Sequence, residues 1–170
     1  FKPQTFDDAF VCFVLEHLPE PEKALICIKD MLKPGGRLTL IEGDHGSWYC
    51  HPETPAARRT VECLIKVQAA MQGDALIGRR LYPLLRSSGF RQVQVVPRMV
   101  YVDQSRPGLV EGFSRNTFIA MVAAVEDQAV DMGLIGREDW RRGINDLYRA
   151  TGPEGTFCYT FFKARAEKGS

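Results

Sequence analysis

Apolar residues form two kinds of run in the first quarter of the chain. The segment Asp8–Val14 is short and almost continuously apolar, which is typical of a strand covered by helices on both faces. After Pro19 and Pro21, apolar residues recur at helical spacing until Lys33–Gly36 ends the pattern. Arg37–Glu42 then alternates and becomes apolar. Strand, helix and strand in this order predict a βαβ unit with a right-handed crossover, and therefore an α/β fold.

The middle of the chain alternates between loop, helical and β-branched patterns. Residues 43–55 contain Gly, Asp, His, Ser and two prolines, which predict a loop at the carboxyl end of a strand, where doubly wound sheets bind ligands. Residues 56–71 and 76–88 mix apolar positions with charges and are each closed by a glycine, so two amphipathic helices are predicted. Residues 93–102 are rich in valine and predict one or two strands, and Pro97 indicates a break, a bulge or an edge position there.

The C-terminal third is predicted to be helical before it ends in a strand. Helical periodicity runs through residues 109–132 and again through residues 139–148. Two successive helices before the last strand indicate an inserted helical cap, which we assign to residues 108–150. The aromatic, β-prone segment 156–163 predicts the terminal strand, and residues 167–170 are expected to form a polar tail.

Composition narrows the classes of protein that fit this pattern. The 170 residues fit one domain, and 45% hydrophobic with 25% charged residues are ordinary values for a soluble globular protein. The 22 Lys and Arg residues against 21 Asp and Glu give a net charge of +1, without the basic excess that binds a phosphate backbone. No apolar stretch approaches the roughly 20 residues of a membrane span. We therefore expect a cytoplasmic protein that binds neither nucleic acid nor membrane.

Four short motifs occur in a recognisable order. They are Phe6–Asp8, Val14–Leu18, Leu32–Leu38 with its Lys-Pro-Gly-Gly turn, and Gly89–Phe90 ahead of the valine-rich strand. Together they resemble the pattern of class I, Rossmann-like methyltransferases that depend on S-adenosylmethionine, and the likeness covers nearly the whole chain. The resemblance implies the C-terminal half of a doubly wound Rossmann-like α/β sheet, with strand order 4-5-7-6, helices on both faces and the helical cap inserted before the last strand.

The same resemblance implies S-adenosylmethionine as the cofactor. In the family the turn after the fourth strand borders the cofactor, so the positions carried over are Cys12, Phe13, Val14 and His17. The first three can equally be core residues, and His17 can equally cap the turn or pack on it. The family's first strand, its GxGxG turn and the acidic residue that grips the ribose would all precede Phe1, and no segment of this sequence matches them. We therefore expect the C-terminal part of a methyltransferase domain, without the glycine-rich cofactor loop.

A sheet that starts at the fourth strand has that strand at its edge. The backbone groups of an apolar edge strand are ready to pair with another chain. We therefore expect a homodimer that forms through residues 8–14.

The loop after the fifth strand supplies the candidate chemistry. Methyl transfer from a sulfonium is an in-line displacement, in which alignment matters most and a base is needed only when the nucleophile carries a proton. Glu42, Asp44 and His45 are candidates for polarising or deprotonating the substrate, and Trp48 and Tyr49 for binding it. The alternative is that the polar residues only form turn hydrogen bonds and that Trp48 packs under a helix.

Two arginines are candidates for binding a substrate carboxylate. Arg79 begins one predicted helix, and Arg115 lies on another that we expect to cover the site. A guanidinium group matches the geometry of a carboxylate, although solvated helix charges look the same in sequence. No metal is predicted, because the following residues match no standard ligand spacing: His45, Cys50, His51 and Cys63.

The sequence supports two functions of different classes. The first is methyl transfer from S-adenosylmethionine to a small-molecule acceptor. The alternative is a non-catalytic, self-associating fragment of a methyltransferase. A dehydrogenase-type Rossmann half fits less well, because the His-Leu turn and the Lys-Pro-Gly-Gly segment do not belong to that pattern.

Overall fold

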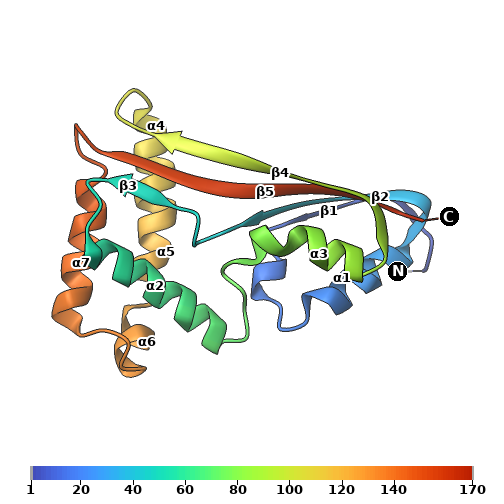
Figure 1. Ribbon diagram of the computed structural model, residues 1–170, viewed down its shortest axis with the longest axis horizontal. Coiled ribbons are helices and arrows are strands. Elements are labelled where there is room, and N and C mark those ends of the chain that lie inside the picture. The colour runs from blue at the N-terminus through green and yellow to red at the C-terminus, as the bar shows by residue number, and fades with distance from the viewer. Residues whose placement is uncertain (1, 170) are drawn as a thin grey trace. The chain divides into compact units, whose positions relative to one another are not determined.

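The chain divides into two compact units. The computed structural model describes residues 2–169, and Figure 1 shows the order of the helices and strands. Two long strands, β4 (Phe90–Val102) and β5 (Thr156–Lys168), contribute residues to both units. Unit 1 is formed by Phe1–Asp44, Gln72–Arg98 and Thr160–Ser170, and unit 2 by His45–Met71 and Met99–Tyr159.

Unit 1 contains the predicted βαβ arrangement. β1 (Phe6–Cys12) and β2 (Leu32–Gly43) are parallel neighbours, and the chain between them forms α1 (Pro21–Met31). β2 pairs antiparallel with residues 161–167 of β5, and β4 also pairs with β5. The sheet is therefore mixed, and the predicted α/β class is confirmed.

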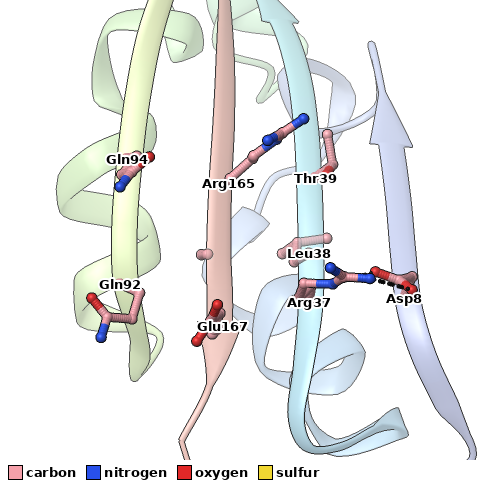
Figure 2. Close-up of a pocket in the computed structure, with 9 residues that line it drawn as sticks. Asp8, Arg37, Leu38, Thr39, Gln92, Gln94, Arg165 and Glu167 are labelled. Carbon is pink, nitrogen blue, oxygen red and sulfur yellow. Dashed lines mark hydrogen bonds and ion pairs between the residues drawn. The ribbon is translucent and has the colours of Figure 1, made fainter.

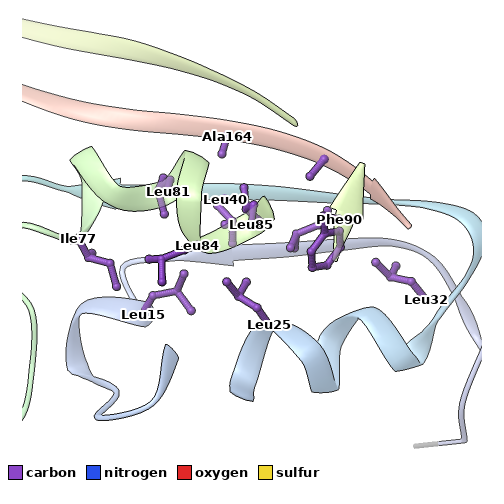
Figure 3. Close-up of a cluster of buried hydrophobic side chains, with 12 residues drawn as sticks. Leu15, Leu25, Leu32, Leu40, Ile77, Leu81, Leu84, Leu85, Phe90 and Ala164 are labelled. Carbon is purple, nitrogen blue, oxygen red and sulfur yellow. The ribbon is translucent and has the colours of Figure 1, made fainter. Parts of the chain in front are cut away.

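A cluster rich in leucine forms the core of unit 1 (Figure 3). Side chains from α1, η1 (Leu15–His17), η2 (Ile77–Arg80) and α3 (Leu81–Ser87) pack there against β2. Each fully buried leucine stabilises the fold by about 1.5–3 kcal/mol relative to an exposed one. The buried members of the cluster are Leu15, Leu25, Leu32, Leu38, Leu40, Ile77, Leu81, Leu84, Leu85, Phe90, Ala164 and Ala166.

The opposite face of the unit 1 sheet is polar. Figure 2 shows side chains of four strands on this face, with the helices behind the sheet. Strand residues alone line a shallow groove of about 590 Å³ there, in which Arg37 pairs with Asp8 at 2.9 Å. The prediction of helices on both faces is therefore wrong for the described part of unit 1, where they pack on one face. Alternation along each strand places charged and amide groups on this side, where they remain in water.

Unit 2 is mainly helical. α2 (Pro55–Ala70) begins after Thr54, whose hydroxyl accepts a backbone N–H of the first turn. α7 (Arg137–Arg149) packs on α2 at Gly143, where a Cβ atom would lie 1.9 Å from Oγ1 of Thr60. Only glycine allows the two helices to approach this closely.

The predicted helix over residues 109–132 is divided into several pieces. The chain turns at Val125, whose φ of −103° and ψ of 17° lie outside the helical region. The helical nature of the segment is confirmed, but its continuity is wrong. The pieces are α4 (Pro107–Leu109), the π-helical segment η3 (Val110–Ile119), α5 (Ala120–Ala123) and α6 (Glu126–Asp131).

An aromatic cluster forms the core of unit 2. Phe118 packs against the rings of Phe157 and Tyr159, with centroids 4.7 Å and 5.8 Å away. Trp48 stacks on Phe157 at 6.4 Å, and Phe113 lies 6.0 Å from the same ring. Tilted and stacked rings at these separations stabilise a core beyond the burial of their area.

Two details of the predicted strand pattern are wrong, and one alternative is settled. The predicted loop 43–55 contains a short strand, β3 (Tyr49–His51), which forms because β5 pairs with it from a distant part of the sequence. β5 itself extends to Lys168, into the predicted polar tail, while Ser170 lies outside the described residues. β4 runs through Pro97 without a break and pairs with β5 alone among the described strands, which is the edge position where proline is tolerated.

Two further features concern the whole described chain. Within residues 2–169, no helix is both long enough and apolar enough to cross a membrane. The five cysteines are free thiols, of which Cys50, Cys63 and Cys158 are buried and Cys27 is exposed. The three buried cysteines therefore serve as small core residues.

Candidate functional site

The first candidate site is the turn that follows β1, residues 12–17. Phe13 has a φ of +54°, in the left-handed region that residues other than glycine rarely adopt. Its N–H donates to the Ile41 carbonyl at 2.9 Å, and its ring packs against Phe161 with centroids 5.4 Å apart. Backbone strain of this kind persists only where the surrounding structure enforces it, and it gathers at functional sites.

The carboxylate of Glu42 holds the same turn. Glu42 lies near the end of β2 and is fully buried, and its Oε1 accepts the N–H groups of Val14 at 3.1 Å and Leu15 at 3.0 Å. Oε2 is also buried and has no hydrogen-bond partner among the described residues. Burial raises the pKa of the Glu42 carboxyl. The backbone amides of Leu15 and Val14, and to a smaller extent that of Glu16, oppose the rise, while the charge of the Glu16 carboxylate adds to it. Glu42 thus interacts with the backbone of the turn.

The four residues predicted to bind the cofactor differ in exposure along this turn. Phe13 and Val14 are each 44% exposed. The side chain of His17 is 65% exposed, and its Nε2 lies 3.5 Å from the Glu16 carboxylate. Cys12 is half-buried, and burial raises the pKa of its thiol. Apolar side chains left in water at the end of β1 form a surface that a ligand can cover.

Asp44 and Arg79 form a two-pronged ion pair in unit 1. The Nε and Nη2 groups of Arg79 donate to Oδ2 and Oδ1 of Asp44 at 2.7 Å and 2.8 Å. The hydrogen bond to Asp44 raises the pKa of Arg79. Gly78 permits the approach, because a Cβ atom there would lie 2.6 Å from the Gly43 carbonyl oxygen. The side chain of Asp44 is buried, whereas that of Arg79 is 47% exposed.

His45 is buried in unit 2 beside the hydroxyl of Tyr159. The Nδ1 atom of His45 and the Tyr159 hydroxyl oxygen are hydrogen-bonded at 2.8 Å, and the two residues are 5% and 2% exposed. Which of the two groups donates depends on the tautomer of the ring. Orientation through one ring nitrogen is common among histidines that transfer protons. Tyr159 therefore fixes the direction of the His45 ring.

Trp48 and Tyr49 are neighbours in sequence but have opposite surroundings. Trp48 is a buried member of the aromatic cluster, and the Arg58 guanidinium lies 5.9 Å from its ring centroid. Tyr49 is 49% exposed on β3, with its hydroxyl 3.9 Å from the sulfur of Met99. Of the two, Tyr49 is accessible to a substrate in this conformation.

Arg115 is attached to other residues of unit 2. Its Nε donates to Oγ1 of Thr151 at 2.9 Å, and its Nη1 donates to Glu111 at 3.4 Å. The side chain is 41% exposed. The hydroxyl and the carboxylate together fix the direction of the guanidinium.

The predicted site residues divide between the two units. Sequence reasoning missed Tyr159, because the only signal there is the aromatic, β-prone character of the last strand. Within residues 2–169, no group of three His, Cys, Asp or Glu side chains is arranged to hold a metal ion. Unit 1 holds Cys12, Phe13, Val14, His17, Glu42, Asp44 and Arg79, and unit 2 holds His45, Trp48, Tyr49 and Arg115.

The sequence is similar to those of a methyltransferase and a carboxymethyltransferase. A family described as a methyltransferase domain matches residues 1–40. The chain is 25% identical over 171 residues to methyltransferase str2 of Strobilurus tenacellus, covering 96% of this chain and 62% of that protein. It is 29% identical over 149 residues to the tRNA U34 carboxymethyltransferase of Chromohalobacter salexigens, covering 84% of this chain and 40% of that protein. The chain thus spans less than two thirds of either relative.

Solved structures agree with the fold. A methyltransferase structure from Bacillus halodurans covers all of this chain at a TM-score of 0.51 and 13% identity, and 73% of that protein is matched. The YcgJ protein of a Bacillus species gives a TM-score of 0.50 at 14% identity, with 100% of this chain and 67% of that protein covered. The fold is therefore the Rossmann-like α/β fold of methyltransferases. These matches support the resemblance to class I S-adenosylmethionine-dependent methyltransferases that the four motifs predict.

Proposed function

We propose that this protein takes part in methyl transfer from S-adenosylmethionine to a small-molecule acceptor. The observation that carries the proposal is the strained turn after β1, which leaves Phe13 and Val14 exposed at the end of a sheet strand. In the family this turn borders the cofactor. A rigid backbone holds these apolar side chains in water. A flat, partly apolar ligand that covers them would remove their surface from water.

The residues of the turn suit a cofactor that they contact through side chains. The N–H groups of Val14 and Leu15 already donate to Glu42, so the turn offers a ligand its apolar side chains and the exposed imidazole of His17. Cys12, Phe13, Val14 and His17 are the proposed cofactor contacts. When bound, the cofactor supplies a methyl group activated on a sulfonium. The residues of the turn orient the cofactor and shield it from water.

Each unit offers its own candidate contact to the acceptor. In unit 1, Arg79, held by Asp44, is assigned to an anionic group of the acceptor. In unit 2, Arg115, held by Thr151, is assigned an equivalent role. Tyr49 offers an exposed ring to the acceptor. Its neighbour Trp48 stacks on Phe157 and thereby anchors this segment to the aromatic cluster. His45 is the proposed proton acceptor, which an acceptor with a protonated nucleophile requires.

We further propose that β1, β2, β5 and β4 correspond to the fourth, fifth, seventh and sixth strands of the family. The pairing of β1 with β2, of β2 with β5 and of β5 with β4 supports this correspondence. The helices within residues 108–150 then form the inserted cap, which is the proposed source of acceptor specificity.

Calorimetric titration of the intact protein with S-adenosylhomocysteine tests the proposal. We expect micromolar binding, and substitution of Phe13 by Asp is expected to weaken it, because a charge would replace the apolar contact. Replacement of the exposed Tyr82 by Phe is the matched control, since Tyr82 lies outside the proposed contacts. Absence of binding, or equal binding of NADH, would refute the cofactor assignment.

Self-association through β1 is a separate proposal. Among the described strands, β1 pairs with β2 alone, and Phe10 on β1 is 65% exposed. An apolar edge of this kind can pair with the same strand of a second copy. Sedimentation velocity should give a dimer that the Phe10→Lys variant weakens, whereas a monodisperse wild-type monomer would contradict the proposal.

A further inference from the structure

Glu42 differs in geometry from a residue that removes a proton from a substrate. A general base must lie within hydrogen-bonding reach of the atom it deprotonates. Glu42 is 0% exposed, and one of its two carboxylate oxygens is already used twice by backbone amides. We propose that Glu42 is a positioning residue that holds residues 12–17 in the conformation that meets the cofactor. The inference rests on the cofactor site proposed above and adds to it a residue that does not touch the ligand.

Two consecutive residues of β2 hold consecutive amides of the turn. The carbonyl of Ile41 accepts the N–H of Phe13 at 2.9 Å. The side chain of Glu42 then accepts the next two N–H groups, those of Val14 and Leu15, at 3.1 Å and 3.0 Å. Successive N–H groups of this kind form a concave anion site. In this protein the anion is a side chain of the same unit.

This arrangement accounts for the strained backbone at Phe13. A φ of +54° is unfavourable for a residue with a Cβ atom, so neighbouring contacts must enforce it. The turn is fixed on one side by the Phe13 amide and on the other by the two amides bound to Glu42. Loss of the carboxylate would release the second side. The side chains of Phe13 and Val14 would then lose their fixed direction.

The burial of Glu42 shows why backbone amides must be its partners. A buried carboxylate is stable only when hydrogen bonds replace its water. Oε1 has two such bonds, whereas Oε2 has none among the described residues, and burial raises the pKa of the group accordingly. The side chain therefore has one function that its surroundings support, which is to accept the amides of the turn.

Amide hydrogen exchange measured by NMR tests the positioning role without any ligand. In Glu42→Met, the amides of Val14 and Leu15 should exchange about tenfold faster or more, because a hydrogen bond to a charged group is lost. Glu42→Gln keeps a carbonyl oxygen at the same place, so exchange within about threefold of the wild type is expected. The amides that join β1 to β2 should not change in either variant.

Two further variants make the exchange experiment decisive. If Glu42→Met fails to fold, Glu42→Asp replaces it, since a side chain shorter by one methylene cannot reach both amides and should also accelerate their exchange. Glu22→Met is the matched control, because Glu22 is exposed on α1 and accepts a hydrogen bond from the Ser87 hydroxyl instead of from the turn. Unchanged exchange at Val14 and Leu15 in the Met or Asp variant would overturn the proposal.

Titration with S-adenosylhomocysteine then separates the two proposals. A positioning role predicts that Glu42→Gln binds within about threefold of the wild type and that Glu42→Met binds at least about tenfold more weakly. Equal affinity of Glu42→Met and the wild type would refute the positioning role. If the wild type does not bind S-adenosylhomocysteine but amide exchange in the Glu42 variants changes as expected, the proposed cofactor site is refuted. The contact between Glu42 and the turn is then still established.

Discussion

The two units bury polar groups in different ways. In unit 1 the carboxylate of Glu42 lies beside a core of aliphatic side chains and is stabilised by two backbone amides of a turn. In unit 2 the imidazole of His45 lies beside an aromatic cluster and is hydrogen-bonded to the hydroxyl of Tyr159. A backbone partner orders a segment of chain, whereas a side-chain partner orders one ring. Glu42 is therefore bonded to a segment of backbone, and His45 to a single side chain.

The largest expected effects come from the two cores themselves. Phe90→Ala in unit 1 and Phe118→Ala in unit 2 should each lower the free energy of unfolding by about 3–5 kcal/mol, since both rings are 1% exposed. Hydrogen exchange should report the loss first in the unit that carries the substitution. If either variant accelerates amide exchange equally in both units, the two units unfold together. They would then form one cooperative core, not two.

Close helix packing in unit 2 comes next. Gly143→Ala should lower the free energy of unfolding by about 1–3 kcal/mol, because the new Cβ atom would lie 1.9 Å from Thr60 Oγ1 and 2.7 Å from the Ala56 carbonyl oxygen. Gly112→Ala is the control, since nothing lies within 4 Å of its Cβ position and alanine favours a helix by up to about 1 kcal/mol. Thermal unfolding measures both, and equal stability of the two variants would show that α2 and α7 can separate without cost.

The hydrogen bond between Tyr159 and His45 should have a smaller effect. Tyr159→Phe removes one buried hydroxyl and should lower the free energy of unfolding by about 1–2 kcal/mol. Tyr82→Phe, at a tyrosine that is 53% exposed, should change it by less than about 0.5 kcal/mol. Urea denaturation of both variants checks this, and indistinguishable midpoints would mean that the Tyr159 hydroxyl does not stabilise unit 2.

The smallest effect on stability concerns Cys50 in unit 2. At neutral pH its burial should change the reactivity of the thiol more than the free energy of unfolding. Burial, with a contribution from Glu53, raises the pKa of Cys50 from 9.0 to about 11. At pH 8 iodoacetamide should therefore label the exposed Cys27 well before Cys50, because the thiolate is the reactive form. The folded state favours the thiol, so this stabilisation is full below pH 9 and is lost as the pH rises towards about 11. Mass spectrometry of a labelling time course measures both rates. Equal rates for Cys27 and Cys50 would contradict the raised pKa of Cys50.

Local signals explain which elements the sequence predicted. The α1 pattern between Pro21 and the Lys-Pro-Gly-Gly segment, and the apolar runs that became β1 and β2, depend on neighbours a few residues away. β3 was missed because Tyr49–His51 has no strand pattern of its own and forms only against residues 156–158 of β5. The division of the helix at Val125 likewise has no strong breaker in sequence.

The candidate site was predictable by residue type but not by partner. The composition of the loop after the fifth strand indicated Glu42, Asp44 and His45 as a group of polar residues. Their partners lie 27, 35 and 114 positions away in the chain, at Leu15, Arg79 and Tyr159. No spacing rule connects residues so far apart. From the sequence alone, a Glu42 carboxylate that holds a turn therefore cannot be told from one that accepts a proton.

The sequence by itself determined the resemblance to methyltransferases and the α/β class of this protein, because motif order and hydrophobic period are properties of neighbouring residues. The tertiary structure alone decided that the helices of unit 1 cover one face of its sheet, that Asp44 is paired with Arg79 and that Glu42 is bound to the turn after β1. Those outcomes depend on burial and on contacts between distant segments. A buried polar group must find whichever partner the fold brings within reach, and that partner decides its role.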